Sequence, residues 1–395
     1  MPRYAPLILW ALLFAPLALA AEDQRPIENV LDHGAQADGE HDDAAAIQAA
    51  IDALPPEGGT VLLPPSPDPY VIRSGIRVHK SHVTIEGFLA TIRWADRAMD
   101  GQIIDAIEIR GTPEKPLENI TVRGLTIDAN YWAQPGSYNP RGIDIDHARK
   151  VLIDRLHITR AFVGLTFGQG VSHSEARDCL ITHWHNDAYN ASADGETGSC
   201  HHIRFVRCRA ANSRDERAGG LPGNRNNAWE IEDGTEHVTL VDCVVENCGG
   251  NGFAIRNHGA WDRPVHTRHT SLIRCRADDV SRHGFYARGI NNDITVEDIH
   301  LEDCVSDSVI LFHKDVRGLR WERCRFPASI TLGPARDVVL RHCELGKITL
   351  WASEVQTDEG YYQTTLKLVD CLVNAAISVY GDDEHVTRRA ETTRP

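Results

Sequence analysis

Two pairs of acidic residues in the chain have a spacing that suits acid–base chemistry. In Ala228-Trp229-Glu230-Ile231-Glu232-Asp233, apolar and acidic residues alternate, which is typical of a strand whose two glutamates point to the same face. Cα atoms two residues apart on a strand are about 6.5–7 Å apart. Hydrolysis of a glycosidic bond needs one carboxylic acid and one carboxylate at such separations. Asp144 and Asp146 have the same spacing.

Two further acidic residues lie near Glu230 and Glu232, one next to them in sequence and one on the preceding predicted strand. Asp233 follows Glu232 directly, and Asp187 lies in His185-Asn186-Asp187. Crowding of like charges raises the pKa of one carboxyl, so a protonated acid would be available near neutral pH. A Glu-x-Glu-Asp strand is also an ordinary solvated surface, and both interpretations remain open.

The strands that carry these residues recur along the chain, and stacking would bring the repeats together. One outward column would then read Asp146, Gly168, Ser192, Glu232, Arg256, Arg288, His313, Gly333 and Trp351. The column two residues earlier would read Asp144, Thr166, Asn190, Glu230, Ala254, Tyr286, Leu311, Thr331 and Thr349. Neighbours in a column are about 4.8 Å apart. We expect both columns to face solvent along one groove.

The residues of this groove have candidate roles. Arginines offer bidentate contacts to substrate carboxylates, or they pair with acidic neighbours. Histidine and lysine are candidate bases or plain surface residues, and exposed aromatic rings can stack on sugars. The predicted catalytic residues are Asp187, Glu230, Glu232, Asp233, His258 and Arg288. The predicted substrate-binding residues are Asp144, Asp146, Asn190, Arg256, Tyr286, His313, Lys314 and Trp351.

A repeated phrase positions these residues. The pattern apolar-x-apolar-x-x-(Cys or Leu)-x-apolar, as in Val238 to Val245, recurs through most of the chain and is preceded each time by a short alternating strand. A unit of about twenty residues with two short strands cannot bury its own apolar face and must stack on its neighbours. The sequence therefore predicts an all-β fold, a right-handed parallel β-helix. The longest insertions, residues 193–227 and 257–283, are expected to form walls beside the groove.

The two ends of the chain differ from the repeats. Residues 1–20 combine Arg3, an apolar run and Ala18-Leu19-Ala20, which is typical of a signal peptide, so the protein is predicted to be secreted or periplasmic. An amphipathic helix over residues 43–54, with Asp42 or Asp43 as N-cap, would cap the solenoid. One domain is expected over residues 22–380, followed by a polar tail over 381–395.

Charge and cysteine content narrow the class further. Lys plus Arg number 41 against 56 Asp plus Glu, a net charge of −15, which argues against nucleic acid and anionic membranes as partners. We expect a monomer. Eight of the ten cysteines share one inward repeat position, which predicts a column of stacked thiols, with disulfides between neighbours as the alternative: Cys179, Cys208, Cys243, Cys275, Cys304, Cys324, Cys343 and Cys371.

The amino-terminal repeats resemble a known superfamily. GAQADGEHDDAAAIQAAIDA, then GGTVLLP, YVIRSGIRV and VTIEG, resemble the amino-terminal region of pectate-lyase-like β-helix proteins. These include polygalacturonases, rhamnogalacturonases, related lyases, alginate epimerases and phage tailspikes. The resemblance covers residues 30–90 and continues as coil periodicity to about residue 380. It implies the fold, while the reaction depends on the site.

Two groups within this superfamily share further features with the chain. Residues 120–130 look like alginate epimerases, but the G-F-D-P-H motif expected after the next phrase is replaced here by Gly164-Leu165-Thr166-Phe167-Gly168. The order Asp187, Glu230 and Glu232, His258, Arg288 is similar to that of polygalacturonases, without their NTD, GHG and RIK motifs.

Three functions are consistent with these features. The first is a secreted enzyme that hydrolyses an acidic, uronic-acid-containing polysaccharide. The second is a polysaccharide lyase or C5-epimerase with Lys314, Arg288 or His258 as base, in which calcium would be held by Asp144 and Asp146 or by the Glu230 cluster. The third is a glycan-binding protein without activity. No cofactor is required for the first.

Overall fold

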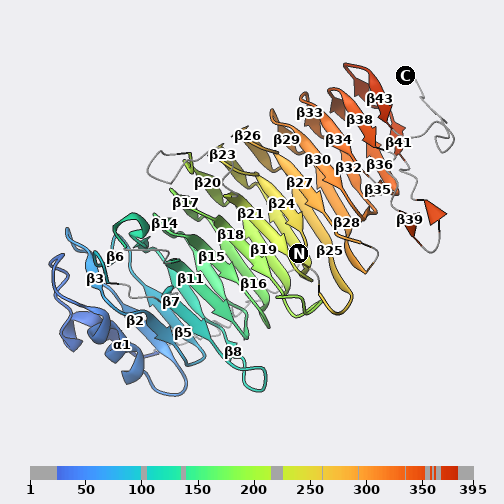
Figure 1. Cartoon of the computed structure of the whole chain (residues 1–395). Coiled ribbons are helices and arrows are strands. Elements are labelled where there is room, and N and C mark those ends of the chain that lie inside the picture. Colours follow the sequence, from blue (N-terminus) through green and yellow to red (C-terminus); the bar gives the residue numbers. More distant parts are fainter. Residues whose placement is uncertain are drawn as a thin grey trace, which may run out of the picture.

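The chain is built almost entirely of short parallel strands stacked into three sheets. The computed structural model describes residues 25–98, 105–134, 139–214, 226–259, 261–291, 293–333, 335–351, 356–357, 360–361 and 366–380. One sheet has 17 strands and two have 12 strands each, and the strand pairings within each of these sheets are parallel. This is the predicted right-handed parallel β-helix (Figure 1). The predicted signal peptide (1–20) and tail (381–395) lie outside the described residues.

We name the three sheets the long sheet, the second sheet and the site sheet. The site sheet contains β4 (Ile76–Val78), β7 (Asp105–Arg110), β11 (Arg141–Asp146), β15 (Val163–Phe167), β18 (Asp187–Ser192), β21 (Asn227–Glu232), β24 (Phe253–Arg256), β27 (Phe285–Arg288), β30 (Ile310–His313), β34 (Ile330–Leu332), β38 (Ile348–Trp351) and β43 (Ile377–Tyr380). The second sheet contains β3 (Tyr70–Ile72), β6 (Thr91–Trp94), β10 (Thr126–Asp128), β14 (His157–Thr159), β17 (Leu180–Thr182), β20 (Arg209–Ala211), β23 (Val244–Cys248), β26 (Arg276–Val280), β29 (Val305–Ser306), β33 (Arg325–Phe326), β37 (Glu344–Leu345) and β42 (Leu372–Val373).

The long sheet contains β1 (Ile27–Asn29), β2 (Gly59–Leu62), β5 (Val83–Glu86), β8 (Leu117–Glu118), β9 (Thr121–Arg123), β12 (Ala148–Arg149), β13 (Leu152–Asp154), β16 (Ser172–Arg177), β19 (His201–Val206), β22 (Glu236–Val241), β25 (Val265–Ile273), β28 (Ile294–Glu302), β31 (Val316–Arg317), β32 (Arg320–Glu322), β35 (Ala335–Arg336), β36 (Val338–Arg341) and β41 (Leu366–Val369). Outside the three sheets, β39 (Gln356–Thr357) pairs with β40 (Gly360–Tyr361) in an antiparallel ribbon, and two 3₁₀ turns span η1 (Val30–His33) and η2 (Tyr131–Ala133).

Each coil contributes strands to three sheets, so the prediction of two strands per repeat was wrong. The chain turns from the long sheet into the second sheet at a single residue with positive φ, such as Asp242 (φ 55°) between β22 and β23. One left-handed residue makes this corner without the glycine or proline that usually marks a turn in a sequence. The described parts of the two long insertions are likewise not walls, because they contain the strands β19, β20, β25 and β26, while residues 215–225 and 260 lie outside the described residues.

The interior is filled by side chains that repeat once per coil. Tyr189, Trp229, Phe253 and Phe285 stack on successive strands of the site sheet, with ring centroids 4.4, 5.0 and 5.1 Å apart. These separations match the strand spacing, so each inward ring packs on the ring of the next coil. Trp229 and Ile231 are fully buried, as the alternating pattern predicted.

The corner after the long sheet carries the cysteines on its inner side. All ten cysteines are free thiols, which confirms the predicted column for the eight that share the corner position. Each of these eight Sγ atoms lies close to backbone carbonyls, as Cys208 Sγ does at 3.3 Å from Ala176 O. The thiols therefore act as small apolar residues with a weak donor.

The free thiols give a simple test in solution. Under denaturing conditions without reductant, Ellman titration should find all ten thiols. The native protein should react at no more than Cys371, because the other nine thiols are buried and a thiolate in that environment is disfavoured. A count lower by two in the denatured protein would show a disulfide and contradict the column.

On the outer side of the same corner, the residues with positive φ alternate in charge. Their order along the solenoid is Asp178, Arg207, Asp242, Arg274, Asp303 and Arg323, with φ between 50° and 55°. Three pairs make close ion-pair contacts: Arg207 to Asp178 at 2.7 Å, Arg274 to Asp242 at 2.6 Å and Arg323 to Asp303 at 2.8 Å. We call this row the corner charge ladder.

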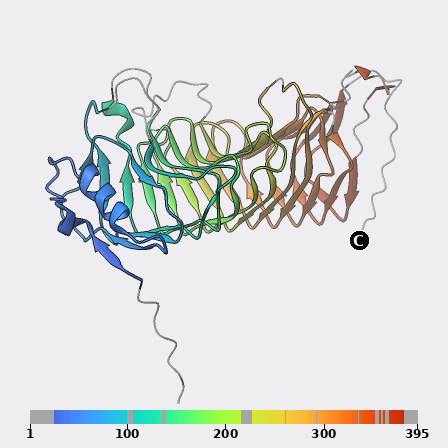
Figure 2. The same ribbon diagram turned by 90° about the horizontal axis from the view of Figure 1, so that it is seen from below.

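The first coil is covered by the helix α1 (Ala44–Ala53), which lies across the amino-terminal end of the solenoid (Figure 2). Its Ile47 and Ile51 are fully buried. Asp43 precedes the helix but makes no side-chain cap. Its carboxylate accepts the N–H groups of Gln36 and Ala37 at 2.7 and 3.1 Å instead, and so ties the preceding loop to the helix start. None of the helices in the described part of the chain has the length and apolar character needed to span a membrane.

Candidate active site

The central strands of the site sheet are in the predicted register. Ser192, Glu232, Arg256, Arg288 and His313 are partners on β18, β21, β24, β27 and β30. The expectation that the acidic part of this column faces solvent was wrong. Asp187, Glu230 and Glu232 are 2%, 2% and 8% exposed, and Asp144 and Asn190 are also buried. Longer polar side chains from neighbouring strands and turns cover the carboxyl groups.

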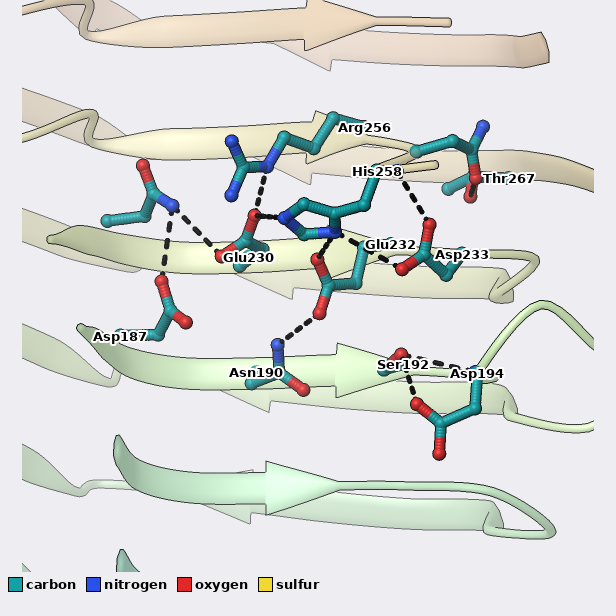
Figure 3. A network of polar contacts seen from close by, with 12 residues as sticks. Asp187, Asn190, Ser192, Asp194, Glu230, Glu232, Asp233, Arg256, His258 and Thr267 are labelled. Carbon is teal, nitrogen blue, oxygen red and sulfur yellow. Dashed lines mark hydrogen bonds and ion pairs between the residues drawn. The ribbon is translucent and has the colours of Figure 1, made fainter. Parts of the chain in front are cut away.

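Glu230 lies at the centre of this cluster and is held by three donors. The Arg256 guanidinium contacts its carboxylate directly, Asn227 Nδ2 donates to it at 3.0 Å, and His258 Nε2 lies 3.4 Å away (Figure 3). Burial alone would raise the pKa of Glu230, but Arg256 and His258 outweigh it and the pKa lies below its usual value. Glu230 is therefore ionised at neutral pH.

Asn227 joins Glu230 to Asp187 on the neighbouring strand. Its Nδ2 also donates to Asp187 Oδ1 at 3.1 Å, and its Oδ1 accepts from Asn251 Nδ2 at 2.7 Å. Asn251 in turn lies 2.8 Å from His283 Nδ1. Complete burial and the charge of Glu230 raise the pKa of Asp187 well above its usual value, so this carboxyl is protonated at neutral pH.

The residues of this amide relay, Asn227, Asn251 and His283, were not predicted, although the sequence holds a signal for them. Asn227, Asn251 and His283 each stand one residue before an alternating strand phrase, and Asp187 occupies the same place in its own coil. A column read one residue before each of these phrases would have joined Asn227, Asn251 and His283 to the predicted Asp187.

Glu232 and Asp233 lie on either side of His258. His258 Nδ1 is 2.7 Å from Glu232 Oε2 and 3.1 Å from Asp233 Oδ2, and the His258 backbone N–H donates to Asp233 Oδ1 at 2.8 Å. Asn190 Nδ2 donates to Glu232 Oε1 at 2.8 Å. Burial, and then the charge of Glu230, raise the pKa of Glu232 to about 8. Hydrogen bonds to Asp233 and Glu232 raise the pKa of His258 to about 10.

The turn that carries His258 is anchored from inside the solenoid. Asn257 is fully buried, donates from Nδ2 to Thr295 O at 2.8 Å and accepts from Thr267 Oγ1 at 2.9 Å. Thr267 Oγ1 also accepts the Gly234 N–H at 3.0 Å, which fixes the turn after Asp233. Asp233 and Gly234 both have positive φ (50° and 97°), so the chain bends sharply where it meets His258. Both sides of the His258–Asp233 contact are thus fixed.

The cluster contains four carboxyl groups and two cationic side chains. Arg256 pairs with Glu230, and His258 pairs with Asp233 and Glu232. Burial and the charge of Glu230 raise the pKa values of Asp187 and Glu232, so these two carboxyls keep their protons at neutral pH. The site therefore holds protonated and ionised carboxyls side by side, as acid–base catalysis requires.

Exposure differs among the central groups and decides which of them a ligand could reach. The side chain of His258 is 39% exposed, whereas those of Arg256, Glu232 and Asp233 are 12%, 11% and 9% exposed and that of Glu230 only 2%. A ligand would therefore contact His258 first, could touch only the edges of Arg256, Glu232 and Asp233, and would not reach Glu230. Glu230, Glu232 and His258 also place one donor atom each within 4.8 Å of one another, which would suit a metal ion.

The predicted basic and aromatic residues lie on the next two strands. The Tyr286 hydroxyl is 3.4 Å from His313 Nε2, and the ring of Tyr286 stacks on His283 with centroids 5.4 Å apart. Burial, and then the charges of Arg288 and Lys314, lower the pKa of His313 to about 4, so this imidazole is neutral. In the described part of the chain, no hydrogen bond or ion pair joins Arg288 to the carboxyl cluster. Arg288 belongs to this second group.

The remaining candidates lie away from the centre. Asp144 and Asp146 are both paired with Arg110 at 2.9 Å, and Asp144 also with Arg141 at 2.5 Å, so protein arginines already balance their charge. Trp351 lies in β38, five strands from β21 in the site sheet, which is about 24 Å at ~4.8 Å per strand. Its side chain lies outside the described part of the structure.

Comparison with known proteins identifies the family and the fold. Residues 27–253 match the family described as "Rhamnogalacturonase A/epimerase, pectate lyase-like". A search of curated proteins found no match. Among solved structures, the chain is similar to PfbA, a surface adhesin of Streptococcus pneumoniae (TM-score 0.63, 13% identity, 93% of this chain and 97% of that one).

Two enzymes have a similar fold. One is an exopolygalacturonase from Thermotoga maritima, with a TM-score of 0.57 and 13% identity over 90% of this chain and 88% of that one. The other is the A-module of the mannuronan C-5 epimerase AlgE4 from Azotobacter vinelandii, with a TM-score of 0.55 and 17% identity over 92% of this chain and all of that one. At these identities the similarity shows the fold alone.

Proposed function

Since the chain belongs to the rhamnogalacturonase A/epimerase, pectate lyase-like family, we propose that it hydrolyses glycosidic bonds in an acidic, uronic-acid-containing polysaccharide. The single observation that supports this most is the protonated Glu232 beside the ionised Glu230, in contact with the more exposed His258. Hydrolysis needs this combination of one acid and one carboxylate.

The geometry suggests a role for each central group. Glu232 protonates the leaving oxygen, and His258 stabilises the carboxylate that this step leaves behind, since its Nδ1 lies 2.7 Å from Glu232 Oε2. Asp233, whose carboxylate lies beside His258 and whose side chain is 9% exposed, activates the attacking water. Glu230 is too buried for direct contact, and its negative charge keeps the pKa of Glu232 high. Arg256 holds Glu230 in its ionised form.

The pairing of charges favours hydrolysis over elimination at the central cluster. A lyase must neutralise the uronate carboxylate with a cation and remove the C5 proton with a base. Here Arg256 and His258 are already engaged with protein carboxylates, and His258 is held protonated and cannot act as a base. A calcium ion at Glu230 would face the Arg256 guanidinium, and His258 supplies a nitrogen where calcium prefers oxygen. We therefore propose that hydrolysis needs no added metal.

A second candidate function is favoured by the Tyr286–His313 pair. A neutral His313 beside a tyrosine hydroxyl can accept a proton, and Arg288 and Lys314 supply positive charge nearby for a uronate. This arrangement would support β-elimination or C5 epimerisation two strands away from the central carboxyls. The similarity of fold to an epimerase module is consistent with it.

One assay separates these functions. The purified protein should be incubated with a panel of uronic-acid polymers, with calcium and with a chelator, and followed by reducing ends, ultraviolet absorbance and proton exchange at C5. Hydrolysis gives reducing ends without an ultraviolet chromophore, elimination gives both, and epimerisation gives C5 exchange alone. Binding without any product would favour the glycan-binding alternative and contradict the proposal.

The pKa of Glu232 gives a pH prediction. Activity should fall as the pH rises through about 8, because Glu232 loses the proton that it must donate. Replacing His258 by glutamine removes a cation that lowers this pKa, so the alkaline limb should move to higher pH. Replacing Glu230 by glutamine removes a charge that raises it, so the limb should move to lower pH. A kcat/KM profile between pH 5 and 10 measures both shifts. If the alkaline limb of the kcat/KM profile lay at the same pH in the wild type and both variants, Glu232 would not be the general acid.

We further propose that the protein acts as an exported monomer. The apolar run and small residues of positions 1–20 support export, and a uronic-acid polymer would be an extracellular substrate. The net charge of −15 disfavours nucleic acid as a partner. Fractionation of the producing cells and size-exclusion chromatography with light scattering test the two statements.

A further inference from the structure

A row of histidines runs along the outside of the long sheet, away from the candidate active site. Its members occupy the same position on four consecutive strands, β16, β19, β22 and β25, and all are exposed: His173, His202, His237 and His269. All have positive φ, between 52° and 57°. We call this row the histidine row.

The imidazole rings of the row stack on one another. Ring centroids are 4.8 Å apart for His173 and His202, 4.7 Å for His202 and His237, and 4.6 Å for His237 and His269. These values equal the strand spacing, so the solenoid itself sets them. The row ends at Asp298, whose carboxylate lies 3.3 Å from His269 Nδ1.

One position of the row is doubled by a second histidine. Neighbouring residues on a strand normally point to opposite faces, but the left-handed conformation of His202 interrupts this alternation. As a result His201 and His202 both lie outside, and their Nδ1 atoms are 2.7 Å apart. Two unprotonated nitrogens cannot face each other this closely without a proton or another cation between them.

The surroundings keep these imidazoles available as ligands. Burial, and then His202 and His173, lower the pKa of His201, and the pKa of His237 is lowered by burial and by His269. Glu236 is the register partner of His201 on the next strand and supplies negative charge, although Arg268 contacts it at 2.7 Å. Neutral imidazole nitrogens are ligands that zinc, copper and nickel ions prefer, whereas calcium and magnesium prefer oxygen.

We propose that His201 and His202 form a surface binding site for a divalent transition metal ion such as Zn²⁺ or Cu²⁺, with His173 and His237 stacked on either side. Two nitrogens that bind one zinc ion at ~2.1 Å are about 3.4 Å apart, so the two rings must rotate apart by less than ~1 Å. Water completes the coordination at this exposed position. The site lies on a different sheet from the Glu230 cluster and does not depend on the proposed hydrolysis.

The experiment is a calorimetric titration of the tag-free chain with Zn²⁺ at pH 7.5. The test variant is the double substitution His201→Asn and His202→Asn, because asparagine also tolerates the left-handed conformation. His342→Asn is the matched control, since His342 is an exposed histidine with positive φ (53°) at another corner. His258→Asn controls for metal binding at the Glu230 cluster.

We expect the double variant to bind Zn²⁺ at least about 10-fold more weakly than the wild type, and both control variants to bind as the wild type does. The electron paramagnetic resonance spectrum of bound Cu²⁺ should show nitrogen ligands in the wild type and lose them in the double variant. Unchanged thermal midpoints without metal would show that the variants fold. Equal Zn²⁺ affinity of wild type and double variant, or an equal loss in His342→Asn, would overturn the proposal.

Discussion

Replacing Glu232 by glutamine is expected to lower turnover by about 10²- to 10⁴-fold, the range by which a positioned general acid contributes. Glutamine keeps the size and the hydrogen bond from Asn190 Nδ2 at 2.8 Å, but it has no acidic proton to give. KM should change little, because the side chain is only 11% exposed and adds little binding surface. Initial rates on the best polymer of the panel, over a range of concentrations, measure both constants.

A matched control is available four residues further along the chain, at the start of the next strand. Glu236 is an outward glutamate on β22 in the long sheet, paired with Arg268, and Glu236→Gln should leave turnover unchanged. Circular dichroism of both variants checks the fold. If Glu232→Gln kept more than about a third of the wild-type turnover, Glu232 would not be the acid. If the wild type made an ultraviolet-absorbing product together with reducing ends, and the variant lost both, the reaction would be an elimination.

Replacing Arg256 by methionine is expected to lower the free energy of unfolding by about 3–5 kcal/mol at pH 7, the usual cost of leaving a buried charge unpaired. Arg256 contacts Glu230, and the two side chains are 12% and 2% exposed. Without the guanidinium, Glu230 is a buried carboxylate that keeps only neutral Asn227 and the more distant His258 as partners. Urea denaturation followed by tryptophan fluorescence gives the value, provided that the transition is two-state.

The pH dependence of this loss follows from the sign of the pKa shift. In the wild type the pKa of Glu230 is lowered, so its stabilising contribution is present above the usual value of 4.5 and is lost as the pH falls through the folded value. In the variant, burial should raise this pKa above 4.5. The difference in free energy of unfolding between the two proteins should therefore shrink as the pH falls below the raised pKa of Glu230 in the variant.

Two further variants separate an unpaired charge from lost packing. Adding Glu230→Gln to Arg256→Met should restore much of the stability, because no charge remains buried. Arg268→Met breaks a half-exposed pair with Glu236 (36% and 16% exposed) and should cost less than about 1 kcal/mol. A loss in Arg256→Met that the second substitution deepens would show that the guanidinium stabilises the site by packing alone.

The sequence predicted the fold because its signals are local and repeated. Inward residues such as Trp229 and Ile231 alternate with outward ones, and each coil repeats this alternation with a cysteine or leucine at one fixed place. The third strand of each coil was missed because the corner depends on one left-handed Asp, Arg or His, as at Asp242. These residue types occur everywhere on a charged surface.

The register of the site could also be predicted, but its electrostatics could not. Glu232, Arg256 and Arg288 are register partners as expected, because the alternating pattern of each strand sets how it aligns with the strand of the next coil. The burial of Glu230 depends on the Arg256 side chain and on the turn that brings His258 over the carboxyls. That turn is held by Asn257 inside the solenoid, a contact between residues that no pattern along the chain connects.

The corner charge ladder bears on how a chain of this kind can change its length in evolution. Along it, Asp178, Arg207, Asp242 and Arg274 alternate, so each side chain lies next to an opposite charge. Excision or duplication of a single rung would bring two arginines or two aspartates together, which is unfavourable between adjacent strands. Gain or loss of two rungs would preserve the alternation. We therefore expect natural length variants in this region to differ by an even number of rungs.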